Sequence, residues 1–449
     1  MKTVSVYRRK LIVLALPIVI QNILSAAVGS MDVLMLNFVD QDSISAVSLA
    51  SQVGTILFMF YYGLGTGATM LCSQYWGKGD SEAVRIVQGI AMRVSLSVSV
   101  LFFLAAELCP RTLMLIFTNS EPLIERGVSY LRFVGAAYLC WGVSEVYLSV
   151  LRAIGRVRIS MALNILAFVL NILFNAVFIF GLFGLPKLGA AGVALGTTLS
   201  RLVELAGCLI LSAVSRDIKL DIRYLFLRNR ALSRDFRHMA VPALANDIVW
   251  GLAFSVYSVI LGHLSDDAVA ANSITTVVRN FGTTMCFGVA SAGGILLGQL
   301  LGQNKKEAAE EAARELVVIT LWSGFFGCLV ILGATPPVVH FANLNENAKH
   351  CLKVMLLINS YYVFGPALNT TLICGIFRAG GDSRYGFFVD LVDMWLYAVP
   401  LGLLSAFVLK LPVLWVYFLM CTDEFVKWPW VIRHYRKKGW LLNITREDW

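Results

Sequence analysis

The sequence contains few charged residues. Asp, Glu, Lys and Arg make up 14% of its 449 residues, whereas globular proteins average about 25%. Hydrophobic residues make up 58%, and the mean hydropathy is +0.74. This composition excludes an ordinary water-soluble protein. At about 20 apolar residues for each membrane span, the chain accommodates roughly a dozen spans and no sizeable soluble domain.

Histidines are also scarce, and the cysteines show no paired spacing. The five His residues fall in predicted loops or at span edges, and the nine Cys residues are scattered singly. This pattern excludes a disulfide framework, a zinc site and a clustered catalytic constellation. We therefore expect no enzyme, no metal site, and no cofactor apart from a coupling ion, H+ or Na+.

Long apolar runs bounded by charges or turn residues predict an all-α membrane protein with twelve transmembrane helices. The runs are about twenty to thirty residues long, which suits helices that cross a bilayer. Their limits are approximately 11–37, 44–72, 86–107, 124–151, 158–182, 189–214, 239–263, 268–300, 315–334, 350–377, 385–408 and 411–432.

The cations in the predicted loops indicate the orientation of these spans. Of the Lys and Arg residues in loops, 26 fall on one side and 4 on the other. Since cytoplasmic loops carry the excess of Lys and Arg, we expect a multi-pass protein of the cytoplasmic membrane with both termini in the cytoplasm. The cations are spread over many loops and form no single basic surface, so a nucleic-acid partner is not expected.

The chain contains an internal repeat. At a shift of 225 residues, Pro17 aligns with Pro242 and Gly63 with Gly288 in a segment without gaps. Six spans in each copy predict two six-helix bundles related as a parallel repeat. The predicted domains are an N-lobe, a polar cytoplasmic linker and a C-lobe with a short basic tail, at 1–214, 215–238 and 239–449.

Pro17 and Pro242 lie early in equivalent spans of the two copies. A proline inside a helix removes a backbone hydrogen bond and kinks the helix. We therefore predict kinks at both positions, which serve either as hinges or only to shape the bundles.

Ionisable residues inside spans are costly and usually face a cavity or a partner. Asp32 lies about six residues from the outer end of the first span, roughly 9 Å deep at 1.5 Å per residue. Asn171 and Asn175, one turn apart on the fifth span, fall at a similar depth. These residues predict a site for a proton or a small cation; the alternative is a hydrogen-bonded structural carboxylate.

A second acidic group occurs in the C-lobe. Asp247 lies early in the seventh span, and Asp390 and Asp393 lie early in the eleventh. Asp390 and Asp393 share one helix face at i, i+3 spacing, so they repel unless a proton or cation intervenes. We predict a cavity for an ion or a cationic substrate; the alternative is simple pairing with Arg279 or another internal cation.

Several motifs together resemble those of the multidrug and toxic-compound extrusion (MATE) transporters, over nearly the whole chain. The motifs are the segment 17–52 with Gly29-Ser30-Met31-Asp32, its copy from Pro242, the pair Gln74-Tyr75-Trp76-Gly77 and Gln299-Leu300-Leu301-Gly302, and Arg378-Ala379-Gly380-Gly381-Asp382. The resemblance implies a secondary antiporter that exports organic, often cationic compounds against protons or sodium ions. It also implies alternating access between two six-helix lobes.

The same resemblance assigns individual residues. Asp32 matches the first-helix acid of the family, which binds the coupling ion. The fifth-helix acid of some members aligns with Asn175, and a seventh-helix Glu of some relatives aligns with Asp247. These departures leave the choice between proton and sodium open.

We therefore expect an ion-coupled exporter of small organic molecules that works as a monomer among membrane lipids. The alternative is a flippase for lipid-linked oligosaccharides of the same superfamily. A flippase favours a cation-rich cavity that holds a pyrophosphate, whereas the internal candidates here are mainly acids.

Overall fold

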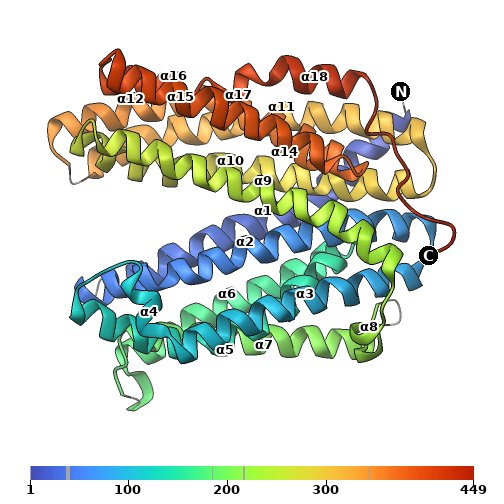
Figure 1. Ribbon diagram of the computed structural model, residues 1–449, viewed down its shortest axis with the longest axis horizontal. Coiled ribbons are helices and arrows are strands. Elements are labelled where there is room, and N and C mark those ends of the chain that lie inside the picture. Colours follow the sequence, from blue (N-terminus) through green and yellow to red (C-terminus); the bar gives the residue numbers. More distant parts are fainter. Residues whose placement is uncertain (1, 37–40, 185, 216–217, 343) are drawn as a thin grey trace. The chain divides into compact units, whose positions relative to one another are not determined.

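The computed structural model describes the backbone of all residues except 1, 37–40, 185, 216–217 and 343. It describes the same side chains except those of 2–5, 26–34, 36 and 41–42. Across the described ranges the chain forms helices joined by short connections, without a strand (Figure 1). Contacts divide the chain into two compact units. Unit 1 is Met1–Asn22 with Ala245–Thr445, and unit 2 is Ile23–Leu244 with Arg446–Trp449.

Unit 2 contains the helices of the first repeat. Its elements are α2 (Gln41–Lys78), α3 (Ser81–Leu108), α4 (Pro110–Leu115), α5 (Glu121–Ala153), α6 (Val157–Phe180), η1 (Leu182–Gly184), α7 (Ala190–Val214) and α8 (Ile222–Phe226). Helix α5 lies centrally in this unit, because it contacts α2, α3, α6 and α7.

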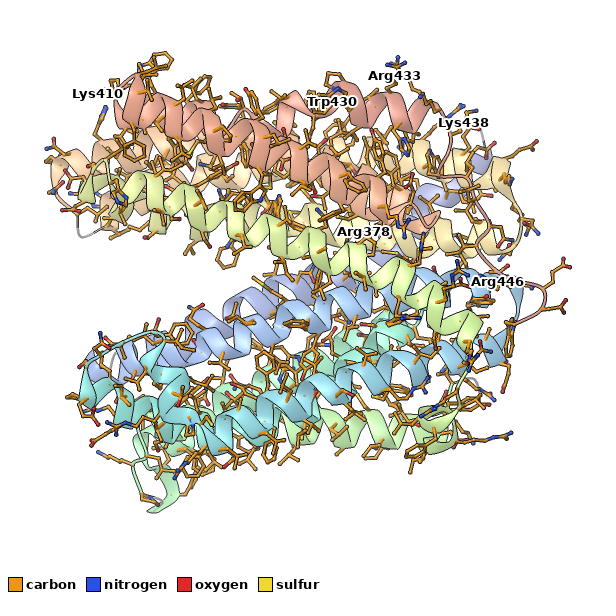
Figure 2. The ribbon with its side chains drawn as sticks, viewed as in Figure 1. Arg378, Lys410, Trp430, Arg433, Lys438 and Arg446 are labelled. Carbon is orange, nitrogen blue, oxygen red and sulfur yellow. The ribbon has the colours of Figure 1, made fainter. Side chains whose placement is uncertain are left out.

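Unit 1 contains the helices of the second repeat. Its elements are α10 (Asp266–Gly302), α11 (Lys306–Phe341), α12 (Glu346–Tyr362), α13 (Phe364–Thr370), η2 (Thr371–Phe377), α14 (Ser383–Val392), η3 (Asp393–Ala398), α15 (Val399–Leu403), η4 (Leu404–Val408), α16 (Val413–Met420), α17 (Asp423–Val426) and α18 (Trp428–Arg436). Within this unit, Lys410 lies at one end of the helices and Lys438 toward the other (Figure 2). The sequence predicts these two lysines on opposite sides of the membrane.

The twelve predicted spans all coincide with helical segments, and the predicted fold class is confirmed. Ten helices of the described residues are long and apolar enough to cross a membrane. The first predicted span corresponds to α1 (Lys2–Leu36), and the last is divided among α16, α17 and α18.

Helix α3 shows how the residues are sorted for a lipid solvent. Its Leu101 and Leu108 are 64% and 74% exposed, as expected of side chains that contact acyl chains. Its buried face carries Ser95 and Ser99. Ser95 donates a hydrogen bond to the Gly142 carbonyl (2.8 Å), and the hydroxyls of Ser99 and Tyr61 lie 2.7 Å apart. Small and polar residues thus pack the helices together where lipid is excluded.

The first helix of each repeat packs on the second helix of the other repeat. In unit 2, Leu244 of α9 (Arg230–Gly262) lies against Gly63 of α2, and in unit 1, Val19 of α1 lies against Gly288 of α10. A Cβ atom at either glycine would overlap its neighbour. The two contacts are equivalent under the 225-residue shift, so the repeat seen in the sequence recurs in the packing.

Pro17 lies inside α1 and Pro242 inside α9. Each helix passes from one compact unit to the other shortly after its proline, between Asn22 and Ile23 and between Leu244 and Ala245. The contact-defined units therefore differ from the predicted lobes: residues 1–22 group with the second repeat, and 239–244 with the first. The kinks themselves stay a prediction.

Helices α10 and α11 approach closely at a pair of glycines. A Cβ atom on Gly327 would lie 2.6 Å from the carbonyl oxygen of Gly282. Gly333, on the same helix α11, has open space around it. Backbone contact at Gly327 therefore requires the absence of a side chain.

We predict that Gly327→Ala lowers the thermal unfolding temperature of the detergent-solubilised protein, because the new methyl group must push the two helices apart at a cost of about 1–3 kcal/mol. The matched control is Gly333→Ala, which adds the same methyl in open space and should be neutral or stabilising by up to about 1 kcal/mol. Equal unfolding temperatures for the two variants would contradict the close packing at Gly327.

Candidate functional site

A buried lysine in unit 1 organises the largest group of internal charges that the described residues show. Lys427 is 1% exposed, and its Nζ lies 2.9 Å from Asp390 Oδ1, 3.5 Å from Asp393 Oδ2 and 3.2 Å from Glu424 Oε2. Asp390 and Asp393 therefore share a face as predicted, and the intervening cation is Lys427. The predicted alternative is pairing with Arg279 or another internal cation. Lys427 is such a cation, whereas Arg279 stacks over the ring of Phe254 at 4.6 Å.

A chain of polar contacts extends from Asp390 to Asp247. Asn246 of α9 donates to Asp390 Oδ2 at 2.7 Å and accepts from Arg378 Nη2 at 2.8 Å. The same Arg378 nitrogen lies 3.5 Å from Asp247 Oδ1. The three carboxylates predicted for the second lobe thus belong to one network, which Asn246 joins.

Two further acids complete the group from helix α17. Asp423, fully buried, accepts a hydrogen bond from the Tyr257 hydroxyl at 3.2 Å. Glu424, 2% exposed, accepts from Asn369 Nδ2 at 2.7 Å. Lys427 directly follows α17, so this short segment supplies charges of both signs to the group.

We call this set of ionisable residues, all buried except the partly exposed Asp247, the acidic cluster. Its members are Asp247, Asp390, Asp393, Asp423 and Glu424 with the cations Arg378 and Lys427. The five carboxylates outnumber the two cations, so an added proton or cation would reduce the excess of negative charge in the cluster. Buried charges inside a membrane are expensive and mark ion, proton or substrate pathways.

Asp393 is the least satisfied carboxylate of the acidic cluster. It is fully buried, and neither of its oxygens has a hydrogen-bond partner in the described part of the chain. Among the described residues its one ionic contact is with Lys427, whose Nζ lies 3.5 Å from Asp393 Oδ2. A buried carboxylate without donors is costly, so Asp393 is a natural position for a proton or a cation to bind.

The backbone around the acidic cluster departs from a regular α-helix. Segments η2, which precedes Arg378, and η3, which begins at Asp393, are π-helical. Such widened turns are rare and frequent at functional sites. Asp390 therefore lies in the α-helical segment α14, whereas Asp393, only three residues later, begins a π-helical segment.

Some members of the acidic cluster escape the sequence prediction. Arg378 counts as a loop cation there, but it is 2% exposed and bound to Asn246, and Figure 2 marks its place in unit 1. The sequence prediction also assigns no function to Asp423, Glu424 and Lys427. Three ionisable residues in an otherwise apolar span could have identified them as candidates.

In unit 2 the structure brings Asn171 and Asn175 together on α6. They are 4% and 1% exposed, and Asn175 Nδ2 lies 3.4 Å from Asn171 Oδ1. Asn171 also donates to Thr197 of α7 at 3.2 Å. Asp32 lies on α1, and its side chain falls outside the described residues. The two amides therefore lie together, and their role in an ion site with Asp32 stays a prediction.

Two partly buried ion pairs lie elsewhere in unit 2. Arg201 and Glu204 pair at 2.7 Å, and the Arg201 guanidinium lies over the Trp141 ring at 4.4 Å. Glu145 pairs with Arg152 at 2.8 Å, and Arg152 also donates to Ser149 at 2.7 Å. In both pairs an acid meets one cation, unlike the excess of acid in unit 1.

The sequence profile of the family described as MatE matches this chain twice, at residues 17–177 and 242–404. The starts of the two matches differ by 225 residues, the shift of the internal repeat. The matches together cover more than half of the chain.

Curated relatives match over nearly the full length. The uncharacterized transporter YisQ of Bacillus subtilis is 24% identical, covering 95% of this chain and 93% of the relative. The probable multidrug resistance protein NorM of Thermotoga maritima is 24% identical, covering 93% and 89%. The multidrug resistance protein MdtK of Edwardsiella ictaluri is 25% identical, covering 89% and 87%.

Solved structures show the same fold. A crystal structure of a mutant of the Vibrio cholerae MATE transporter VcmN matches with a TM-score of 0.88 at 17% identity, covering 98% of this chain and all of that one. A MOP superfamily transporter from Pyrococcus furiosus matches with a TM-score of 0.86 at 18% identity, covering 97% and 98%. The fold is that of a multi-pass membrane transporter. The chain belongs to the MATE family.

We predict that Lys427→Met strongly destabilises the protein, by about 3–5 kcal/mol, because it leaves buried carboxylates without their cation. The matched control is Lys349→Met, which removes a lysine from another i, i+3 pair whose Glu346 partner is 91% exposed. That change should cost less than about 1 kcal/mol. Adding Asp390→Asn to Lys427→Met should restore part of the stability.

Thermal unfolding in detergent measures all three variants. Similar losses for Lys427→Met and Lys349→Met would show that Lys427 does not neutralise the acidic cluster.

Proposed function

We propose that this MATE transporter is a secondary antiporter that exports small organic, often cationic compounds in exchange for protons or sodium ions. The acidic cluster carries the proposal: five carboxylates, four of them buried, lie together with two buried cations. An antiporter needs a site where the coupling ion and the substrate compete, and an excess of internal negative charge attracts both.

Asp393 is the coupling group that the geometry favours in unit 1. Its oxygens lack hydrogen-bond donors among the described residues, and Lys427 offers only a 3.5 Å contact. When a proton or sodium ion binds Asp393, Lys427 remains paired with Asp390 and Glu424 at 2.9 and 3.2 Å. One carboxylate can then change its charge while the others stay satisfied.

In unit 2 we assign the same task to Asp32 with Asn171 and Asn175. Asn171 and Asn175 are joined at 3.4 Å and are buried on α6. Amide oxygens and a carboxylate are suitable ligands for a small cation, and the carboxylate alone suffices for a proton. Loss of the negative charge on Asp32 would weaken the hold on a cationic substrate and so couple the two flows.

Alternating access requires the lobes to move, and α1 and α9 are suited to be hinges. Each contains a proline at an equivalent repeat position and passes between the compact units a few residues later. Proline weakens the helix at that point by removing a hydrogen bond. We place both termini in the cytoplasm and the protein in the cell membrane, as a monomer.

The acidic cluster also argues against the flippase alternative. A lipid-linked oligosaccharide carries a pyrophosphate, which requires cations in the cavity. In unit 1 the cations Arg378 and Lys427 are already bound to acids at 3.5 and 2.9 Å. The relatives named as multidrug resistance proteins support export of drug-like compounds.

We predict that Asp32→Asn and Asp393→Asn each abolish ion-driven efflux of a cationic dye from proteoliposomes, because neither amide can carry the coupling charge. The assay imposes a proton gradient and a sodium gradient separately, which identifies the coupling ion. Glu346→Gln, which neutralises a carboxylate that is 91% exposed, should keep wild-type transport.

Unfolding temperatures close to wild type would show that the variants are folded. Wild-type dye efflux by both Asp32→Asn and Asp393→Asn under the active gradient would overturn the assignment.

We predict that Pro17→Ala and Pro242→Ala slow transport several-fold without lowering the unfolding temperature, because alanine restores the hydrogen bond that the hinge lacks. The control is Pro336→Ala, which replaces a proline inside α11, a helix that stays within one unit. If all three variants transport alike, helix α1 and helix α9 do not act as hinges at these prolines.

A further inference from the structure

A basic pocket in unit 2 is lined by none of the residues used above. Its volume is about 640 Å³, which is within the range of ligand pockets. Its lining combines arginines with apolar side chains of α3 and α9. The arginines are Arg93, Arg228, Arg230, Arg234 and Arg237, and the apolar residues are Ile90, Val94 and Phe236.

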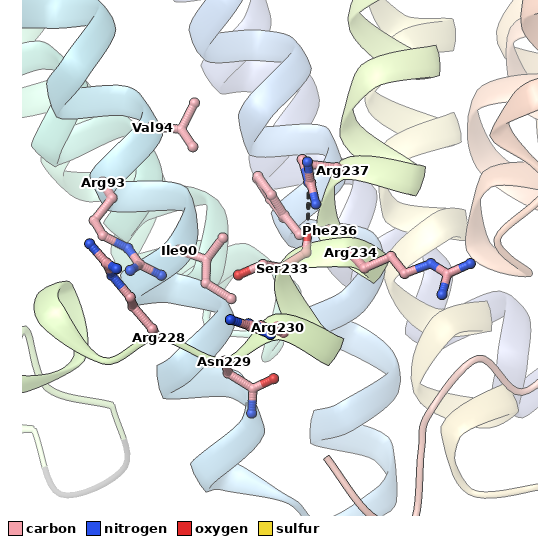
Figure 3. A pocket seen from close by; sticks show the side chains of 10 residues that line it. All are labelled: Ile90, Arg93, Val94, Arg228, Asn229, Arg230, Ser233, Arg234, Phe236 and Arg237. Atoms are coloured by element: carbon pink, nitrogen blue, oxygen red, sulfur yellow. Dashed lines mark hydrogen bonds between the residues drawn. The ribbon is translucent and has the colours of Figure 1, made fainter.

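Two of these arginines approach one another without an acid between them. Figure 3 shows the side chains of Arg93, from α3, and Arg228, from the segment before α9, extending toward each other. Within the described part of the chain, neither Arg93 nor Arg228 forms an ion pair. Like charges repel at short range, so an anion between them would stabilise this arrangement.

The acids of this region already have other partners. Asp235 is bound by Arg446 through two contacts of 2.6 and 2.8 Å. Glu82 accepts hydrogen bonds from the Tyr224 hydroxyl at 2.9 and 2.8 Å. The positive charge of the pocket is therefore available to a ligand.

A short helix next to the pocket indicates the membrane interface. Helix α8 contacts α3, and it presents Ile222 and Phe226, one turn apart, at 74% and 75% exposure. Its Tyr224 faces inward at 8% exposure. Apolar residues on one face of a helix beside cations are typical of a segment that lies in the head-group layer. Arg228 follows only two residues later.

The pocket also continues into a surface suited to acyl chains. Val94 lines the pocket and is 39% exposed. Leu101, Leu104 and Leu108 follow it on the same face of α3, at 64%, 43% and 74% exposure. A molecule with a phosphate at the arginines and a hydrocarbon tail along α3 would satisfy both parts of this surface.

We propose that this pocket binds the head group of an anionic phospholipid of the cytoplasmic leaflet. The phosphate lies between Arg93 and Arg228, and an acyl chain follows Val94 and Leu101 along α3. Basic pockets between helices on the cytoplasmic side are suited to such head groups. The proposal does not depend on the coupling ion or on the exported substrate.

The test is native mass spectrometry of the full-length protein, released from vesicles of equal phosphatidylglycerol and phosphatidylcholine. We expect the wild type to retain phosphatidylglycerol preferentially. Arg93→Gln/Arg228→Gln should weaken that retention about 30-fold, since each interfacial cation contributes about 1 kcal/mol. Arg384→Gln, which neutralises an exposed arginine outside the pocket, should retain the lipid as the wild type does.

A second arm separates a lipid from a free anion. Phosphatidylglycerol should raise the unfolding temperature of the wild type but not of the double variant, whereas inorganic phosphate should raise neither. The proposal is overturned if the double variant retains phosphatidylglycerol as the wild type does, or if inorganic phosphate alone stabilises the wild type equally. Removal of two repelling charges should leave the variant folded, and its unfolding without lipid shows this directly.

Discussion

The ammonium group of Lys427 is the interaction on which the second lobe depends. It is 1% exposed and lies within 3.5 Å of three carboxylates. Without that cation, the acids on α14, η3 and α17 would repel one another across a low-dielectric interior, where such repulsion is strong. The helices that carry Asp390, Asp393 and Glu424 thus meet around one positive charge.

The same constraint is the basis of the transport role that we propose for the acidic cluster. Lys427 neutralises only part of the negative charge of the cluster. Binding of a proton or cation would therefore bring the net charge of the cluster closer to zero. A fully paired network would be stable and inert, as Arg201 with Glu204 exemplifies at 2.7 Å. A partly paired network changes its contacts when an ion arrives, and the π-helical turn at Asp393 offers a backbone that can adjust.

The two repeats share their architecture but not their chemistry. The contact of Gly63 with Leu244 and that of Gly288 with Val19 are equivalent, so the packing follows the repeat. The buried polar groups do not follow it: unit 2 places the amides Asn171 and Asn175 on α6, whereas unit 1 gathers five acids. The two repeats thus share their helix packing, whereas the polar residues inside each lobe differ.

Much of the fold was predictable because lipid imposes simple rules. Apolar runs give the spans, and collinear residues such as Pro17 and Pro242 reveal the repeat. The acidic site was predictable only in part. The spacing of Asp390 and Asp393 shows that they share a helix face, but it does not show which cation pairs with them. Lys427 lies more than thirty residues away, between α17 and α18, and Arg378 is predicted in a loop although the fold buries it. Partners across helices are set by tertiary packing, which no local pattern contains.

The measurement that tests the central claim most directly is ion displacement on substrate binding. A cationic dye is added to the solubilised transporter in weakly buffered solution, and proton release is followed; its affinity is then compared with and without sodium. The account predicts that binding releases protons or that sodium weakens binding, and that Asp393→Asn with Asp32→Asn removes the effect. Dye binding that neither releases protons nor responds to sodium would contradict it.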